Sequence, residues 1–148
     1  MRKIKRDNTK LMCDIGEISG LFADSTSLES FLQRIVEMIG EHMKSEVCSI
    51  YLYYPDREEL VLKANTGLNP LSMGKIKLKL GEGITGWALK ELRPINERHA
   101  SQNPHFRSFP GIGEERFESF LVVPIIRGVA RIGFHVAAYE LGALLILF

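Results

Sequence analysis

The stretch that decides the fold is LGEGITGWAL at residues 80–89, because it follows an alternating, strand-like run and begins a helix-like one. Its three glycines have the spacing G-x-G-x-x-G, which also occurs in dinucleotide-binding turns. A dinucleotide site needs a βαβ unit and an acidic residue about 20 positions later, and Glu91 and Glu97 come too early. Pro94 ends the helical segment, because proline lacks an amide donor and disfavours helix at the preceding residue. The glycines therefore predict a tight bend rather than a phosphate cradle.

The segments around this bend predict an antiparallel sheet. Residues 47–53 alternate in polarity, and residues 55–57 supply a turn before residues 59–66 run back as a second strand. Residues 75–80 alternate with their lysines toward solvent, where the charges discourage pairing between sheet edges. Further extended segments are predicted at residues 94–96, 120–126 and, after a turn at Arg127-Gly128, 130–134.

Two amphipathic helices precede the sheet. Apolar residues at helical spacing predict a first helix over residues 8–22. Thr26 and Glu29 form a plausible capping box for a second helix, whose apolar stripe runs from Leu28 to Met43. The elements together predict an α+β fold, an α/β sandwich with five or six antiparallel strands. The N-terminal helices cover one face of the sheet and a loop-rich layer covers the other.

The loop-rich layer is a long irregular crossing at residues 97–116. Connections of this length in compact domains are usually binding loops, lids or disordered segments. This one is too aromatic for disorder, since it holds His99, His105, Phe106 and Phe109 and leads into Phe117. The two histidines are six residues apart, a spacing that no common metal motif uses, so ordinary loop histidines are expected.

Composition narrows the class of protein. The 148 residues predict one domain with a single core, and a net charge of +1 from 19 basic and 18 acidic residues gives no footprint for nucleic acid or an anionic membrane. Cys13 and Cys48 make no disulfide framework or zinc motif, which fits reduced thiols in a cytoplasmic protein. Asp14 and Glu17 interrupt any signal peptide, and the apolar tail at residues 134–148 is too short to span a membrane.

Five blocks resemble, in the same order, the sequence pattern of GAF domains, small α/β modules that sense ligands or form dimers. The blocks lie at residues 46–53, 59–68, 81–88, 93–96 and 120–126. Within the family, residues 103–106 and 113–121 resemble the N-terminal GAF domain of the nitrogen-branch phosphotransferase enzyme I. The resemblance covers residues 10–133. It ends at the atypical tail, residues 134–148, where GAF domains normally add a strand and a long amphipathic helix.

The resemblance implies an apolar cavity between the sheet and the loop layer, the usual form of a small-molecule site. Its lining is expected from the first strand, the glycine bend, the crossing and the start of the apolar strand: Ser49, Tyr51, Thr85, Trp87, His99, His105, Phe106, Phe117 and Ser119. Each of these side chains can equally belong to a filled core, and the sequence leaves both interpretations open.

Three chemical specialisations of GAF relatives are not expected. Bilin-binding members use a cysteine in the crossing loop, and residues 97–116 contain none. Members that reduce free methionine sulfoxide use several cysteines, and only Cys48 is expected near this pocket. The Asn-Lys-x-Phe-Asp-Glu type of motif of cyclic-nucleotide binders does not occur in the sequence. We therefore expect no catalytic residue, no cofactor and no metal ion.

The resemblance implies a non-catalytic regulatory domain that binds a small cytosolic metabolite and controls a nitrogen-related phosphotransfer protein. We expect a homodimer built through the helical side, with the tail helping to cover that side, because closed two-fold dimers are the commonest soluble oligomers. One alternative is a dimerisation module that binds no ligand. Another is a small redox enzyme that uses Cys48.

Overall fold

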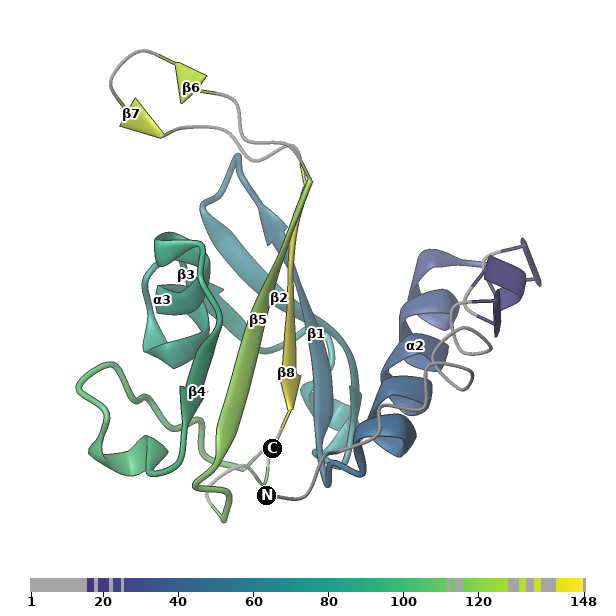
Figure 1. Cartoon of the computed structure of the whole chain (residues 1–148), viewed down its shortest axis with the longest axis horizontal. Helices are drawn as coiled ribbons and strands as arrows, with labels where there is room; N and C mark the ends of the chain where they lie inside the picture. Colours follow the sequence, from purple (N-terminus) through teal and green to yellow (C-terminus); the bar gives the residue numbers. More distant parts are fainter. Residues whose placement is uncertain are drawn as a thin grey trace, which may run out of the picture.

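The computed structural model describes residues 16–127, except 18, 22, 25, 112, 114 and 115, together with residues 131–132, 135–136 and 141–147. Its described strands form a six-stranded sheet in the order β3-β2-β1-β8-β5-β4, in which all neighbours are antiparallel (Figure 1). The strands are β1 Cys48–Tyr54, β2 Glu59–Thr66, β3 Lys77–Lys79, β4 Ile95–Glu97, β5 Phe120–Arg127 and β8 Leu141–Leu147. β6 Arg131–Ile132 and β7 His135–Val136 pair with each other outside this sheet. The predicted α+β fold is confirmed.

The main departure from the sequence analysis is the position of the tail. β8 lies in the middle of the sheet, where it pairs with β1 on one side and β5 on the other. The prediction that the tail covers the helical side is therefore wrong for residues 141–147, because their backbone is used to join the two halves of the sheet. The turn expected at 127–128, and most of the segment 130–134, lie outside the described residues.

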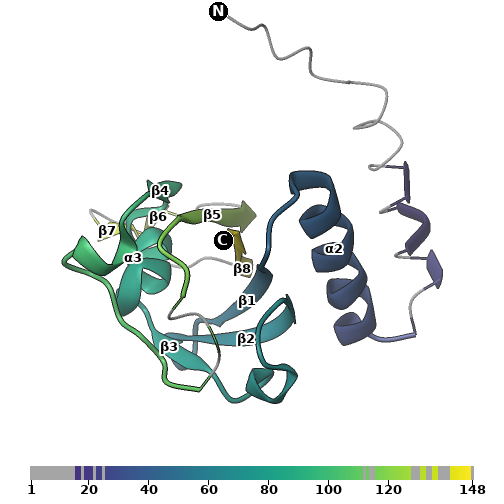
Figure 2. The ribbon, with the colours of Figure 1, turned by 90° about the horizontal axis from the view of Figure 1, so that it is seen from below.

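α2, Leu28–Met43, covers the face of the sheet formed by β1 and β2 (Figure 2). Leu32 and Val36 of its apolar stripe are buried against Cys48, Ile50 and Ala64. Figure 2 shows α3 and the crossing on the opposite side of the sheet. We call the side under α2 the helix face and the other side the loop face.

The capping box of α2 begins one residue later than predicted. Ser27 is the N-cap in an extended conformation, and its hydroxyl accepts a hydrogen bond from the Ser30 amide at 3.1 Å. Ser30 Oγ accepts in return from the Ser27 amide, so Thr26 and Glu29 do not form the box. Of the predicted first helix at 8–22, residues 16–17 and 19–21 are helical, and the rest lies outside the described residues.

The glycine bend connects β3 to α3, Gly83–Glu91, as the spacing predicted. Gly81 has φ +85°, which side chains rarely adopt, and its amide donates to the carbonyl of Gly86 at 2.9 Å. A Cβ on Gly86 would lie 2.6 Å from the carbonyl oxygen of Lys79, so this position has no room for a side chain. The bend is a close approach between a strand and a helix, the geometry that the structural interpretation of G-x-G-x-x-G predicts.

The loop face carries the larger hydrophobic cluster. α3 and the crossing, which includes the short 3-10 helix η2 Ala100–Gln102, lie over this face (Figure 1). A second 3-10 helix, η1 Pro70–Ser72, follows β2 and is tied to the crossing, since Asn69 Nδ2 donates to the Gly111 carbonyl at 3.3 Å. The buried floor of the cluster includes Leu60 and Leu62 of β2 and Val122 of β5. This floor supports the candidate site.

Candidate functional site

A small cavity lies on the loop face, between the sheet, the glycine bend and the crossing. Its volume is about 20 Å³, which is room for about one water molecule. Its walls are formed by Tyr51, Leu78, Gly83, Ile84, Thr85, Phe106, Arg107, Phe109 and Phe120. Most of the lining residues are apolar, and Tyr51, Thr85 and Arg107 are the three whose side chains carry polar groups.

Three of the predicted site residues meet at this cavity. Tyr51 reaches it from the middle strand β1, Thr85 from the first turn of α3 and Phe106 from the crossing. Tyr51 and Thr85 are buried, and Phe106 is half-buried against the core cluster. Segments that are distant in sequence thus contribute to one cavity.

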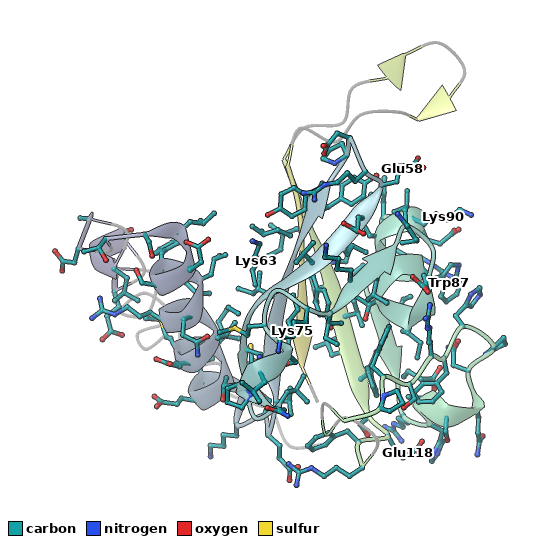
Figure 3. All side chains as sticks on the ribbon, turned by 180° about the vertical axis from the view of Figure 1, so that it is seen from behind. Glu58, Lys63, Lys75, Trp87, Lys90 and Glu118 are labelled. Atoms are coloured by element: carbon teal, nitrogen blue, oxygen red, sulfur yellow. The ribbon has the colours of Figure 1, made fainter. Side chains whose placement is uncertain are left out.

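Trp87 and His105 lie beside the cavity rather than in its lining. Their rings stack at 4.0 Å between centroids with an interplanar angle of 11°. Arg93 adds a cation–π contact, with its guanidinium carbon 5.3 Å from the centroid of the Trp87 ring. Figure 3 shows Trp87 on the side of α3 that faces the crossing. The stack holds the crossing against α3 from outside.

Arg107 was not predicted as a site residue, although it directly follows Phe106. It lines the cavity and forms an ion pair with Glu82, whose side chain is 25% exposed. Glu82 is the N-cap residue of α3, and its other carboxylate oxygen accepts a hydrogen bond from the Lys79 amide at 2.7 Å. The ion pair is thus a second attachment between the crossing and the glycine bend. The sequence signal that could have identified Arg107 is its position as a basic residue within an aromatic loop.

The other predicted residues lie outside the cavity lining. Ser49 shares the loop face with Tyr51 but is buried one pleat away, opposite Asn65. Phe117 packs against Val47 and Leu68 in a separate cluster. His99 is exposed, and Ser119 lines a different, open hollow of about 250 Å³ beside Met43. Ser49 was expected in the site because alternation gives its face but not its position along the strand, and the other three because the path of the crossing between its ends is not visible in the sequence.

A polar network fixes the start of the crossing. Glu97 accepts hydrogen bonds from the Asn103 side chain at 2.9 Å and from the amides of Arg98 and His99. The Asn103 hydrogen bond, followed by that from the His99 amide, lowers the pKa of the Glu97 carboxyl. Asn103 Oδ1 in turn accepts from the His105 amide at 2.9 Å. The network leads from β4 to the residues that stack on α3 and line the cavity.

Cys48 does not belong to the site. It is buried in the helix-face cluster with Val36 and Ile50, on the side of the sheet opposite the cavity. Burial raises the pKa of its thiol to about 12, so the thiolate needed for redox chemistry is suppressed at neutral pH. Within the described residues, no group of three or more His, Cys, Asp and Glu side chains is placed to hold a metal ion. The helices of the described part include none long and apolar enough to cross a membrane.

Comparison with known protein families gives a match to one family. The family model described as GAF domain matches residues 25–142, which is more than half of the chain. The match includes the glycine bend, the crossing and the strands that form the cavity.

Two relatives with known names are similar in sequence. The chain is 36% identical over 117 residues to a phosphoenolpyruvate-dependent phosphotransferase system protein of Escherichia coli, covering 79% of this chain and 16% of that protein. It is 30% identical over 116 residues to the nitrogen fixation protein VnfA of Azotobacter vinelandii, covering 76% and 22%. The chain therefore spans only about a sixth to a fifth of the length of these relatives.

Solved structures give the same assignment. The chain resembles the GAF domain of a phosphoenolpyruvate-protein phosphotransferase from Coxiella burnetii with a TM-score of 0.77 and 28% identity, covering 95% of this chain and 78% of that one. It also resembles the GAF domain of the Acinetobacter phosphoenolpyruvate-protein phosphotransferase, with a TM-score of 0.71, 27% identity and coverage of 92% and 74%. A free methionine-R-sulfoxide reductase from Neisseria meningitidis shares the fold at a TM-score of 0.64 and 20% identity, covering 90% and 69%.

Proposed function

This chain belongs to the GAF-domain family, and from that premise we propose that it is a regulatory domain that binds a small cytosolic metabolite on its loop face. The observation that carries the proposal is the cavity beneath the crossing, where Tyr51, Thr85 and Phe106 meet. A mainly apolar lining with a few placed polar groups is the usual composition of a small-molecule site. Binding or release of the ligand would then control the activity of a phosphotransfer or nitrogen-regulatory protein.

The proposal treats the domain as non-catalytic. The described cysteine, Cys48, is buried on the helix face, away from the cavity. The likeness to a methionine sulfoxide reductase is a likeness of fold alone, at 20% identity. Assays for reduction of free methionine sulfoxide should give no activity above the rate of a Cys48→Ala variant.

A thermal-shift screen against cytosolic metabolites tests the proposal, because a ligand that binds only the folded state raises the unfolding temperature. We expect at least one compound to stabilise the wild-type chain. Thr85→Leu places a larger, apolar side chain in the cavity wall and should abolish that increase in unfolding temperature. Thr66→Leu is the matched control, since Thr66 lies on the helix face beside Gly40 and Ser45. A shift that survives Thr85→Leu would place binding elsewhere.

A dimerisation module is the second candidate, and two observations favour it. The cavity of about 20 Å³ is nearly filled, as a purely structural core would be. Met43 and Ile125 are each 51% exposed. Leu121 packs on the helix-face cluster, and Ile125 lies four residues further along the same strand, so it belongs to that face. Among the described helices, α2 packs mainly on β1 and β2, so the exposed Ile125 part of the face is available to a partner.

We propose that a second copy of the chain covers this part of the helix face. Sedimentation at micromolar concentration should give a dimer for the wild-type chain and a monomer for Ile125→Asp. Leu71→Asp is the matched control, because Leu71 is 71% exposed but lies on η1. A wild-type monomer, or equal dissociation by both substitutions, would contradict the dimer.

A further inference from the structure

The cavity is too small for a metabolite while the crossing is in place. At about 20 Å³ it accommodates little more than a water molecule, so any organic ligand requires part of its wall to move. The movable wall is the segment 103–109, which supplies Phe106, Arg107 and Phe109 to the lining. We call residues 103–109 the lid segment. This inference rests on the proposed function.

Two side-chain contacts hold the lid segment on α3 and its N-cap. His105 stacks on Trp87 at 4.0 Å, and Arg107 pairs with Glu82. Both contacts are at the surface, where His105 is exposed and the Arg107 side chain is 51% exposed. Exposed pairs contribute little to stability, so they can be exchanged at low cost.

We propose that the Glu82–Arg107 pair is a latch, and that the ligand carries an anionic group that takes the place of Glu82 on Arg107. Arg107 is the one charged residue among the nine that line the cavity. Its planar guanidinium suits a carboxylate or a phosphate, because its donors match two oxygens of such a group. The ligand class is therefore a small organic anion with a compact apolar body.

The two partners of the latch are anchored differently. Glu82 stays with the bend, because its carboxylate also accepts from the Lys79 amide at 2.7 Å. Arg107 belongs to the lid segment and also lies over the Phe109 ring, with its guanidinium carbon 5.0 Å from the centroid. Opening the lid therefore separates the two charges. An anionic ligand restores a partner to Arg107, whereas a neutral ligand leaves both charges unpaired.

Benzoate and benzamide test this inference, since they have nearly the same shape and differ in charge. Binding is followed by NMR shifts of the backbone amides in the cavity wall and by the fluorescence of Trp87, the single tryptophan of the chain. The wild-type chain should bind benzoate more tightly than benzamide. Glu82→Gln removes the latch and should tighten the binding of both compounds by up to about fivefold, the upper range for an exposed pair, because opening the lid no longer breaks an ion pair.

Arg107→Gln should remove the preference for benzoate, and it should tighten benzamide binding to the same extent as Glu82→Gln, because the latch is absent in both variants. Glu59→Gln is the control for long-range charge effects, because Glu59 lies 3.9 Å from Lys79 Nζ and does not line the cavity. It should leave both affinities at the wild-type values. Preserved dispersion of the NMR spectra shows that each variant is folded.

Three outcomes of the benzoate and benzamide experiment overturn the inference. One is equal binding of benzoate and benzamide by the wild-type chain, and another is a preference that survives Arg107→Gln. The third is an equal gain for Glu59→Gln and Glu82→Gln, which would indicate a general charge effect. A neutral metabolite that binds at the cavity in the thermal-shift screen would overturn the latch but support the proposed function. No binding of any compound at the cavity would overturn both.

Discussion

The two faces of the sheet are closed by different kinds of interaction. On the helix face, α2 lays one continuous apolar stripe on β1 and β2, and Val36 is fully buried there. On the loop face, the floor is equally apolar, but its cover is an irregular segment that packs only partly buried side chains, Phe106 and Phe109, on the floor and is held further by a stack and an ion pair at the surface. The apolar stripe of a helix separates from the sheet only when the whole helix moves away. A segment held by a few exposed polar contacts can open locally while the rest of the domain stays folded. The fold thus places its movable layer over the cavity.

The largest expected effect is a difference in stability loss between substitutions in the floor of the loop face and substitutions in its cover. Leu62→Ala removes a fully buried side chain from the floor and should lower the free energy of unfolding by about 2–5 kcal/mol. Phe106→Ala removes a half-buried side chain of the lid segment and should cost clearly less, despite its larger volume. Urea unfolding measures both values. Equal losses would mean that the lid segment is as firmly packed as the floor.

The next effect concerns the glycine bend. Gly86→Ala should cost about 1–3 kcal/mol, because its Cβ would lie 2.6 Å from the Lys79 carbonyl oxygen and the backbone must shift. Gly83→Ala meets no atom nearer than 3.8 Å and suffers only from its φ of +67°, so its cost should be smaller. We expect neither the wild-type chain nor these variants to bind NAD or FAD. Tight NAD binding that Gly83→Ala abolished in a folded protein would contradict the bend.

A third prediction tests the dry packing of the helix face. The pKa of Cys48 is raised to about 12 in the folded chain, so the unfolded state releases its thiol proton first as the pH increases. The stabilising contribution of Cys48 should be complete below the unfolded pKa of about 8.5 and should disappear as the pH rises toward 12. The loss should be about 2 kcal/mol by pH 10. Cys48→Ala should remove this alkaline dependence, and an unchanged slope would show that another group causes it.

The smallest effect lies in the network that fixes the crossing. The Asn103 hydrogen bond lowers the pKa of Glu97, so its stabilising contribution is present above the unfolded pKa of Glu and is lost as the pH falls through the folded value. The protection factor of the amides of residues 98–106, which is the intrinsic exchange rate divided by their measured rate at the same pH, should therefore fall in acid, while that of α2 stays high. Glu97→Gln should show low protection of residues 98–106 at all pH values. A pH-independent protection factor in the wild-type chain would assign no role to the carboxylate.

Local patterns were sufficient to predict much of the fold. β2 was placed correctly because its alternation is bounded by turn residues, and α3 because the glycines begin it and Pro94 follows it. β8 was not recognised, since its central position depends on pairing with two strands that are distant in sequence. The capping box was shifted by one residue, because four consecutive residues at 24–27 can all serve as N-cap.

The candidate site was predicted in part. Tyr51 and Thr85 were found because regular elements fix their direction once the fold is known. Ser49 shares the face of Tyr51, but alternation gives only the face and not the position along the strand. Arg107 was missed because the ion pair with Glu82 depends on how the crossing folds back over the bend. Contacts of an irregular segment have no period that a sequence pattern can show.

The most direct test of a ligand-gated loop face is hydrogen exchange of the chain with and without the metabolite that gives the largest thermal shift. Without ligand, amides of residues 103–109 should exchange faster than those of residues 32–40 in α2. The metabolite should slow exchange in 103–109 and around Thr85, and should leave α2 unchanged. Protection confined to α2, or equal rates in both segments that no metabolite alters, would contradict the account.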